Sequence, residues 1–228
     1  MGLILNIETA TSICSVALSL AGNVVSMRET SEPNSHSLLL GTFVKEVMEE
    51  ARYEMSELDA VAVSSGPGSY TGLRIGVSMA KGISYSLDIP LISVPTLKAM
   101  ANGIIDKGDI NYLVPMIDAR RMEVYSAIFD RELKEIESVK PVIIDENSYS
   151  ELLRENKVIF FGDGAAKCKQ VINSENAFFS GEGLPSAKSM CSIAEQFFAA
   201  GSFEDTAYFE PFYLKEFQAK ISKVKGLK

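Results

Sequence analysis

Histidine and cysteine are scarce in this chain of 228 residues. It contains one histidine, His36, and three cysteines, Cys14, Cys168 and Cys191, which lie far apart. Any catalytic arrangement built on a histidine base would have to use His36, and no GxSxG motif supplies a serine nucleophile. The cysteines form no CxxC pair, and the residue one helical turn after His36 is Leu40, which argues against a zinc site or a disulfide framework. We therefore expect no metal site and no catalytic residues.

Long apolar runs and excess positive charge are also lacking. The first twenty residues are apolar, but they include Glu8 and no basic residue, which fits neither a signal peptide nor a membrane span. The net charge of −8 disfavours an extended nucleic-acid-binding face, because such faces neutralise phosphates with Lys and Arg. Only residues 215–228 are basic, with five lysines. We expect a cytoplasmic protein with a flexible tail and only indirect contact with nucleic acid.

Apolar residues follow strand and helix periods in an order that occurs twice. Both halves read ββ(β)αβ followed by a glycine turn, which predicts an α/β protein with two related lobes. The predicted lobes are residues 1–107 and 108–214, followed by the tail 215–228. In the first half we expect strands at 3–7, 13–20, 24–29, 58–64 and 91–94 and helices at 35–52, 69–86 and 97–105. In the second half we expect strands at 113–117, 123–129, 138–144 and 157–161 and helices at 148–155 and 185–199.

A glycine-rich turn, residues 64–76, joins a buried strand to a helix. Its glycines permit positive φ angles, and Ser69 or Thr71 would cap the helix. Free N–H groups at a helix start attract anions, but the spacing is not that of a P-loop and no lysine is placed to reach phosphates. The residues favour a structural turn over a phosphate cradle.

The helix that follows this turn carries a stripe of small residues, Gly72, Gly76 and Ala80, at intervals of four. Each interior glycine costs about 1 kcal/mol relative to alanine, so a close contact should offset the cost. A bare stripe lets a second helix approach unusually closely. That second helix could be residues 35–52 of the same lobe or part of another protein, and the pattern leaves both open.

Two turns carry acids in equivalent positions of the two halves. Glu8 ends the first strand, where an acid can hold hydrated Mg²⁺ beside a nucleotide. Asp118 and Arg120 occupy the matching hairpin of the second half. The glycine that follows such an acid in the actin, Hsp70 and sugar-kinase fold is missing here, because Glu8 is followed by Thr9 and Ala10.

Four sequence segments together resemble the TsaB (YeaZ) family. The resemblance is close over residues 1 to about 130. Its most specific segment is the glycine-rich run 66–76. The segments are Ile4-Leu5-Asn6-Ile7-Glu8-Thr9-Ala10, His36-Ser37 with Leu39-Leu40, Gly66-Pro67-Gly68-Ser69-Tyr70-Thr71-Gly72-Leu73-Arg74-Ile75-Gly76, and Asp118-Ala119-Arg120-Arg121-Met122-Glu123-Val124-Tyr125.

The resemblance implies an actin/Hsp70-like (ASKHA) fold and a non-catalytic role in making N6-threonylcarbamoyladenosine at position 37 of tRNAs that read codons beginning with A. In that family a paralogue, TsaD, transfers the threonylcarbamoyl group, TsaE is an ATPase, and TsaB holds TsaD. The implied partners are a TsaD-like paralogue, a TsaE-like ATPase and, in isolation, a second copy of the chain. ATP is then used by the complex, and the chain needs no cofactor of its own.

By motif position, the residues expected at the partner seam are His36, Leu39, Leu40, Phe43, Gly72, Arg74, Ile75, Gly76 and Met79. The residues of a possible degenerate nucleotide cleft are Glu8, Thr9, Gly66, Gly68, Ser69, Asp118 and Arg120. Two alternatives remain. An ATP-dependent kinase or ATPase would use that cleft, and peptidase activity has been attached to relatives of the family.

Overall fold

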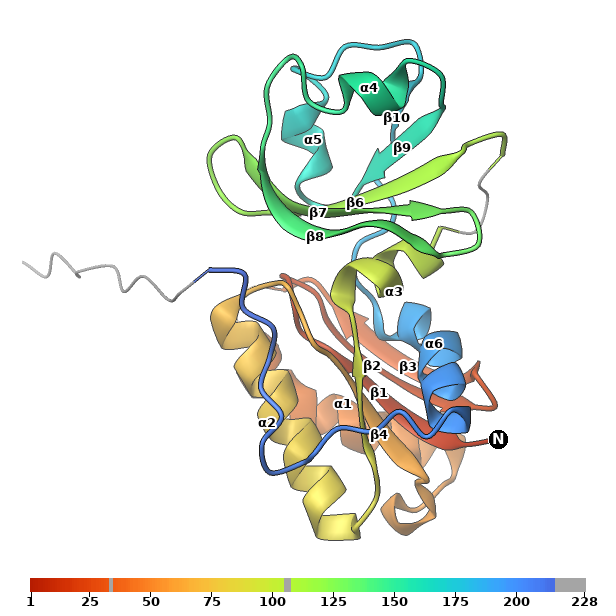
Figure 1. Cartoon of the computed structure of the whole chain (residues 1–228). Helices are drawn as coiled ribbons and strands as arrows, with labels where there is room; N and C mark the ends of the chain where they lie inside the picture. Colours follow the sequence, from red (N-terminus) through yellow and green to blue (C-terminus); the bar gives the residue numbers. More distant parts are fainter. Residues whose placement is uncertain (33–34, 105–107, 216–228) are drawn as a thin grey trace, which may run out of the picture.

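The computed structural model describes residues 1–32, 35–104 and 108–215, which form two lobes, each built on a five-stranded sheet (Figure 1). The predicted boundary near residue 107 lies partly outside the described residues, because 105–107 are not among them. The predicted basic tail also lies outside them, except for Lys215. No helix within the described ranges combines the length and apolarity that crossing a membrane requires.

The first sheet has the strand order β3-β2-β1-β4-β5. Three strands, β1 (Leu3–Glu8), β2 (Cys14–Leu20) and β3 (Asn23–Thr30), form an antiparallel meander. On the other side of β1, β4 (Ala60–Ser64) and β5 (Leu91–Val94) run parallel to it. All six residues of β1 and all five of β4 are buried, as expected of strands covered on both faces.

The second sheet repeats this order as β8-β7-β6-β9-β10. Its meander consists of β6 (Tyr112–Asp118), β7 (Glu123–Asp130) and β8 (Glu135–Ile143). The parallel strands are β9 (Val158–Phe161) and β10 (Ala177–Phe179). The predicted duplicated α/β fold is therefore confirmed. Strand β10 was not predicted, because three residues are too few to show a period.

Helices cover both faces of the first sheet. On one face, α1 (Ser35–Ala51) and α2 (Tyr70–Leu87) pack on every second residue of the strands, such as Leu5 and Val61. On the other face, α3 (Thr96–Asn102) and α6 (Ala187–Ala199) pack on the intervening residues. Because successive side chains of a strand point to opposite faces, the two helix pairs divide the sheet between them.

Smaller elements complete the two lobes. A 3₁₀ turn, η1 (Met55–Glu57), precedes β4. The second sheet is accompanied by two short helices, α4 (Ser150–Leu153) and α5 (Ala165–Cys168). The first of these is shorter than the predicted helix at 148–155, and the second was not predicted.

The end of the chain returns to the first lobe, so residues 108–214 do not form one lobe as predicted. Met190 and Ile193 of α6 pack on Ile4 and Ile92 of the first sheet. Without α6 this apolar face of the sheet would be exposed to water, which is the physical reason for the return. The second lobe of the structure therefore ends before α6.

After α6, residues 203–215 form an irregular segment that we call the strap. It begins beside β5, where the Glu204 N–H donates to the carbonyl oxygen of Leu91 at 2.9 Å. It then follows α2 toward the second lobe (Figure 1). Near its end the Phe212 N–H donates to the carbonyl oxygen of Ser65 at 2.7 Å. The strap therefore packs against the first lobe.

The glycine stripe of α2 faces inward, onto the turn between β1 and β2. A Cβ atom on Gly72 would lie 2.2 Å from the carbonyl oxygen of Thr9, and one on Gly76 would lie 2.2 Å from the Thr9 hydroxyl oxygen. Both glycines are buried. The close contact that offsets their cost is therefore neither α1 nor another protein but a turn of the same lobe, and the placement of Gly72 and Gly76 in a partner seam was wrong.

We predict that Gly72→Ala lowers the free energy of unfolding by about 1 to 3 kcal/mol, because the added methyl group would overlap the backbone of Thr9. The matched control is Gly82→Ala on the same helix, where a Cβ would meet nothing within 4 Å. That variant should gain up to about 1 kcal/mol from helix propensity. Urea denaturation measures both changes. Equal stability of the two variants would contradict the inward-facing stripe.

Candidate functional site

The β1–β2 turn occupies the part of the glycine turn that a phosphate would need. The Ser69 N–H donates to the carbonyl oxygen of Ala10 at 2.6 Å, and a Cβ on Gly68 would lie 2.3 Å from the same oxygen. The Gly72 N–H donates to the Ser69 hydroxyl at 3.3 Å, so Ser69 caps α2 as predicted. Two backbone donors at this helix start, those of Ser69 and Gly72, are therefore already used by the protein itself.

The strap fills the other part of the glycine turn. Gly66 has a φ of 107°, a conformation that favours glycine, and its N–H donates to the Thr96 hydroxyl at 3.0 Å. A Cβ on Gly66 would lie 2.6 Å from the carbonyl oxygen of Phe212. The structure thus brings the predicted cleft residues of the first lobe together, but backbone atoms of the same chain occupy the space beside them.

The Glu8 carboxyl group is enclosed by protein. Its side chain has no exposed surface, and its Oε1 accepts a hydrogen bond of 2.6 Å from the Ala10 N–H. The Oε2 atom has no hydrogen-bond partner among the described residues. Burial raises the pKa of Glu8 to about 7. This enclosure does not suit an acid that holds a hydrated Mg²⁺ ion, because the ion keeps several waters.

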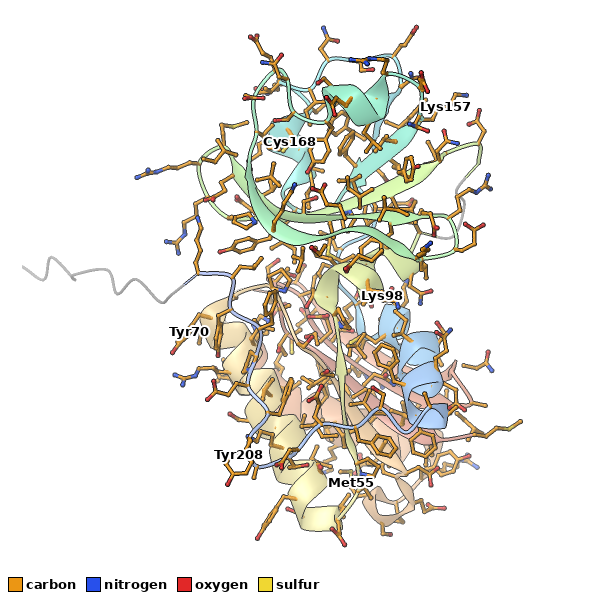
Figure 2. All side chains as sticks on the ribbon, in the orientation of Figure 1. Met55, Tyr70, Lys98, Lys157, Cys168 and Tyr208 are labelled. Atoms are coloured by element: carbon orange, nitrogen blue, oxygen red, sulfur yellow. The ribbon has the colours of Figure 1, made fainter. Side chains whose placement is uncertain are left out.

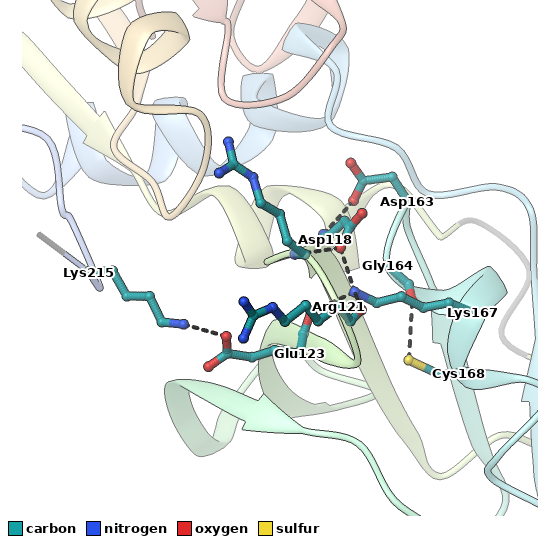
Figure 3. A network of polar contacts seen from close by, with 9 residues as sticks. Asp118, Arg121, Glu123, Asp163, Gly164, Lys167, Cys168 and Lys215 are labelled. Atoms are coloured by element: carbon teal, nitrogen blue, oxygen red, sulfur yellow. Dashed lines mark hydrogen bonds and ion pairs between the residues drawn. The ribbon is translucent and has the colours of Figure 1, made fainter. Parts of the chain in front are cut away.

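The acid of the second lobe, Asp118, belongs to a polar network at the β6–β7 hairpin (Figure 3). Its carboxylate forms an ion pair with Lys167 of α5, and its N–H donates to Asp163 Oδ1 at 3.0 Å. Partial burial acts to raise the pKa of Asp118, but the Lys167 ammonium group and the Arg120 N–H together hold it below its usual value. Lys167 was not predicted, because the periodic pattern did not show α5.

The same hairpin joins the strap to the second lobe. Arg120 and Arg121 have φ angles of 71° and 51°, and the side chains of both are exposed at the tip. Next to them Glu123 forms an ion pair with Lys215, the last described residue of the strap (Figure 3). Lys215 is 47% exposed, so this pair adds little stability by itself. The pair shows where the strap reaches the second lobe.

An open groove of about 940 Å³ runs along the outer face of α2. Ile75, Met79, Ile83 and Leu87 line it at intervals of four residues, and small residues such as Ser78 and Gly82 lie between them. Tyr70 marks one end of the groove and Met55 the other (Figure 2). Two members of this apolar row, Ile75 and Met79, are among the residues predicted at the partner seam, together with glycines that lie on the buried face of the helix.

The remaining residues predicted at a partner seam fall into two groups. Arg74, Ile75 and Met79 line the groove. The members on α1 mostly serve their own lobe: Leu40 is buried in the core, Phe43 packs on it, Leu39 is half-buried, and His36 Nε2 lies 3.1 Å from the Ile13 carbonyl oxygen. Leu40 therefore cannot contact a partner without unfolding of the lobe.

We predict that Glu8→Gln stabilises the protein more as the pH rises. The folded pKa of Glu8, about 7, lies above its ordinary value of 4.5, so its contribution to folding is complete below pH 4.5 and is lost as the pH rises through 7. Gln keeps the shape of the side chain without the charge. Between pH 5 and pH 8 the stability of the variant should improve relative to the parent by about 2 kcal/mol.

Urea denaturation at several pH values measures this difference. The matched control is Glu146→Gln, at an exposed position of the second lobe, which should show no comparable trend. A stability difference between Glu8→Gln and the parent that stays constant from pH 5 to pH 8 would show that Glu8 is not titrating in this range.

Comparison with known proteins places the chain among proteins of tRNA modification. A family model described as "TsaD: tRNA N6-adenosine threonylcarbamoyltransferase" matches residues 28–226. The tRNA threonylcarbamoyladenosine biosynthesis protein TsaB of Escherichia coli K12 is 33% identical over 222 residues, which cover 93% of this chain and 94% of that protein. TsaB of Bacillus subtilis is 34% identical over 176 residues, 74% of each chain.

Solved structures agree with these sequence relatives. YeaZ from Pseudomonas aeruginosa superimposes with a TM-score of 0.77 at 24% identity, over 94% of this chain and all of that chain. A second Pseudomonas aeruginosa structure, described as an uncharacterized protein with similarity to peptidase YeaZ, gives a TM-score of 0.83 at 25% identity over the same shares. The chain therefore belongs to the TsaB (YeaZ) family.

Proposed function

We propose that this chain contributes to N6-threonylcarbamoyladenosine formation in tRNA as a non-catalytic subunit that binds a TsaD-like transferase. The groove along α2 is the docking surface, and the TsaE-like ATPase and the ATP belong to the rest of the assembly. The relationship to TsaB proteins supports the pathway. The groove is the observation that supports the mode of action.

The shape and chemistry of the groove suit a protein partner. Its apolar side chains also pack on the core of the first lobe, so the folded lobe fixes the positions of the groove walls. Between them Ser78 and Gly82 are exposed and small, which leaves room for the side chains of a docked helix. Helices that lie in apolar grooves are a common mode of protein recognition.

The closed cleft supports the non-catalytic part of the proposal. A nucleotide needs free N–H groups for its phosphates and an acid that reaches its metal ion. Here Thr9, Ala10 and Phe212 fill the glycine turn, Glu8 is enclosed, and Asp118 is paired with Lys167. Through these contacts the residues of the cleft stabilise the fold.

We predict that Ser78→Trp abolishes binding to the transferase of the same organism, because the indole would fill the groove. Ser78 is exposed, so the fold should tolerate the change. The matched control is Tyr85→Trp on the same helix, since Tyr85 is 85% exposed and lies outside the groove lining. Gel filtration of each variant mixed with the purified transferase measures the complex. Co-elution of Ser78→Trp at the level of the parent would rule out this docking surface.

We also predict that the isolated chain gives no saturable heat with Mg-ATP in titration calorimetry, because its cleft is closed. The matched control is the assembled complex with its ATPase, which should bind the nucleotide. Saturable binding to the isolated chain that disappears in Asp118→Asn would favour the kinase or ATPase alternative instead.

A further inference from the structure

Arg74 is the one charged side chain among the described residues that line the groove. It is exposed, and its guanidinium carbon lies 4.9 Å from the centre of the Tyr70 ring, within range of a cation–π contact. Tyr70 also contacts Tyr213 of the strap, with 5.0 Å between ring centres. The guanidinium group therefore rests on an aromatic support built from two distant parts of the chain.

The charge of Arg74 has no acidic counterpart within the described part of the molecule, since none of the ion pairs there includes it. Arg28 shows the contrast. It lies on β3 and pairs with Glu46 at 2.9 Å and with Glu50 at 2.6 Å, both from α1 of the same lobe. The charge of Arg28 is thus used in the fold, whereas that of Arg74 remains available at the end of the groove.

A partner that fills the groove would remove water from Arg74. An arginine that loses water without gaining an acid weakens binding, whereas a carboxylate can accept two parallel hydrogen bonds from its planar group. The described lining of the groove contains no acid, so a second copy that met this chain groove to groove about a two-fold axis would bring no carboxylate from its own lining to Arg74.

We propose that Arg74 selects the occupant of the groove: a partner of different sequence that places a carboxylate over the Tyr70–Tyr213 support while its apolar residues fill the groove. This inference rests on the proposed function and specifies the chemistry that the transferase must present. Tyr70 and Tyr213 act as positioning residues, because they restrict the guanidinium group before the partner arrives and reduce the entropy lost on binding.

The test is titration calorimetry of the full chain with the transferase of the same organism. Arg74→Glu should weaken the complex by about 30-fold or more, and Arg74→Lys should weaken it less, because lysine keeps the charge but loses the planar fork. Lys45→Glu is the matched control, a charge reversal on the exposed surface of α1 outside the groove lining, and should change affinity little. Reversal of the contacting acid on the transferase should restore binding to Arg74→Glu.

The outcomes separate this inference from the proposed function. If Ser78→Trp abolishes the complex and Arg74→Glu leaves its affinity unchanged, the groove is the docking surface but Arg74 does not select its occupant. If neither variant affects binding, the proposed function itself fails at this surface. Sedimentation of the parent mixed with Arg74→Glu provides a further check, because a mixed dimer tighter than the parent dimer would identify a second copy as the occupant and overturn the inference.

Discussion

The contact between the β1–β2 turn and helix α2 determines the geometry of the first lobe. The Thr9 carbonyl oxygen lies 2.2 Å from the position that a Cβ of Gly72 would take, and the Ala10 carbonyl oxygen lies 2.3 Å from that of a Cβ on Gly68. Such an approach is open only to glycine, because any other side chain would overlap the turn. With α2 held against the sheet in this way, its stripe of larger apolar residues, starting at Ile75, lines the groove.

The same contact involves two groups that a nucleotide site would need. The turn that sits on α2 uses the N–H of Ser69 and encloses the carboxyl group of Glu8. The residues that correspond in position to a phosphate cradle therefore contribute to folding instead. On our proposal, the fold presents one helix to another protein.

The chain end links the second lobe to the groove. The strap contacts the glycine turn through Phe212, supports Tyr70 through Tyr213, and reaches the β6–β7 hairpin through Lys215. Its last described residues thus connect the aromatic contact of Arg74 with the second lobe.

The sequence by itself determined most of the order of elements and the duplication, and it limited the cap of α2 to Ser69 or Thr71, because apolar periods and short-range hydrogen bonds are local properties of the chain. It also supplied the spacing of Ile75 and Met79, which line the groove. It could not show which face of α2 meets the sheet, since a small-residue stripe suits any close neighbour. Only the tertiary structure decided that Thr9 is this neighbour and that α6 returns to the first lobe, because both depend on contacts between segments far apart in the chain.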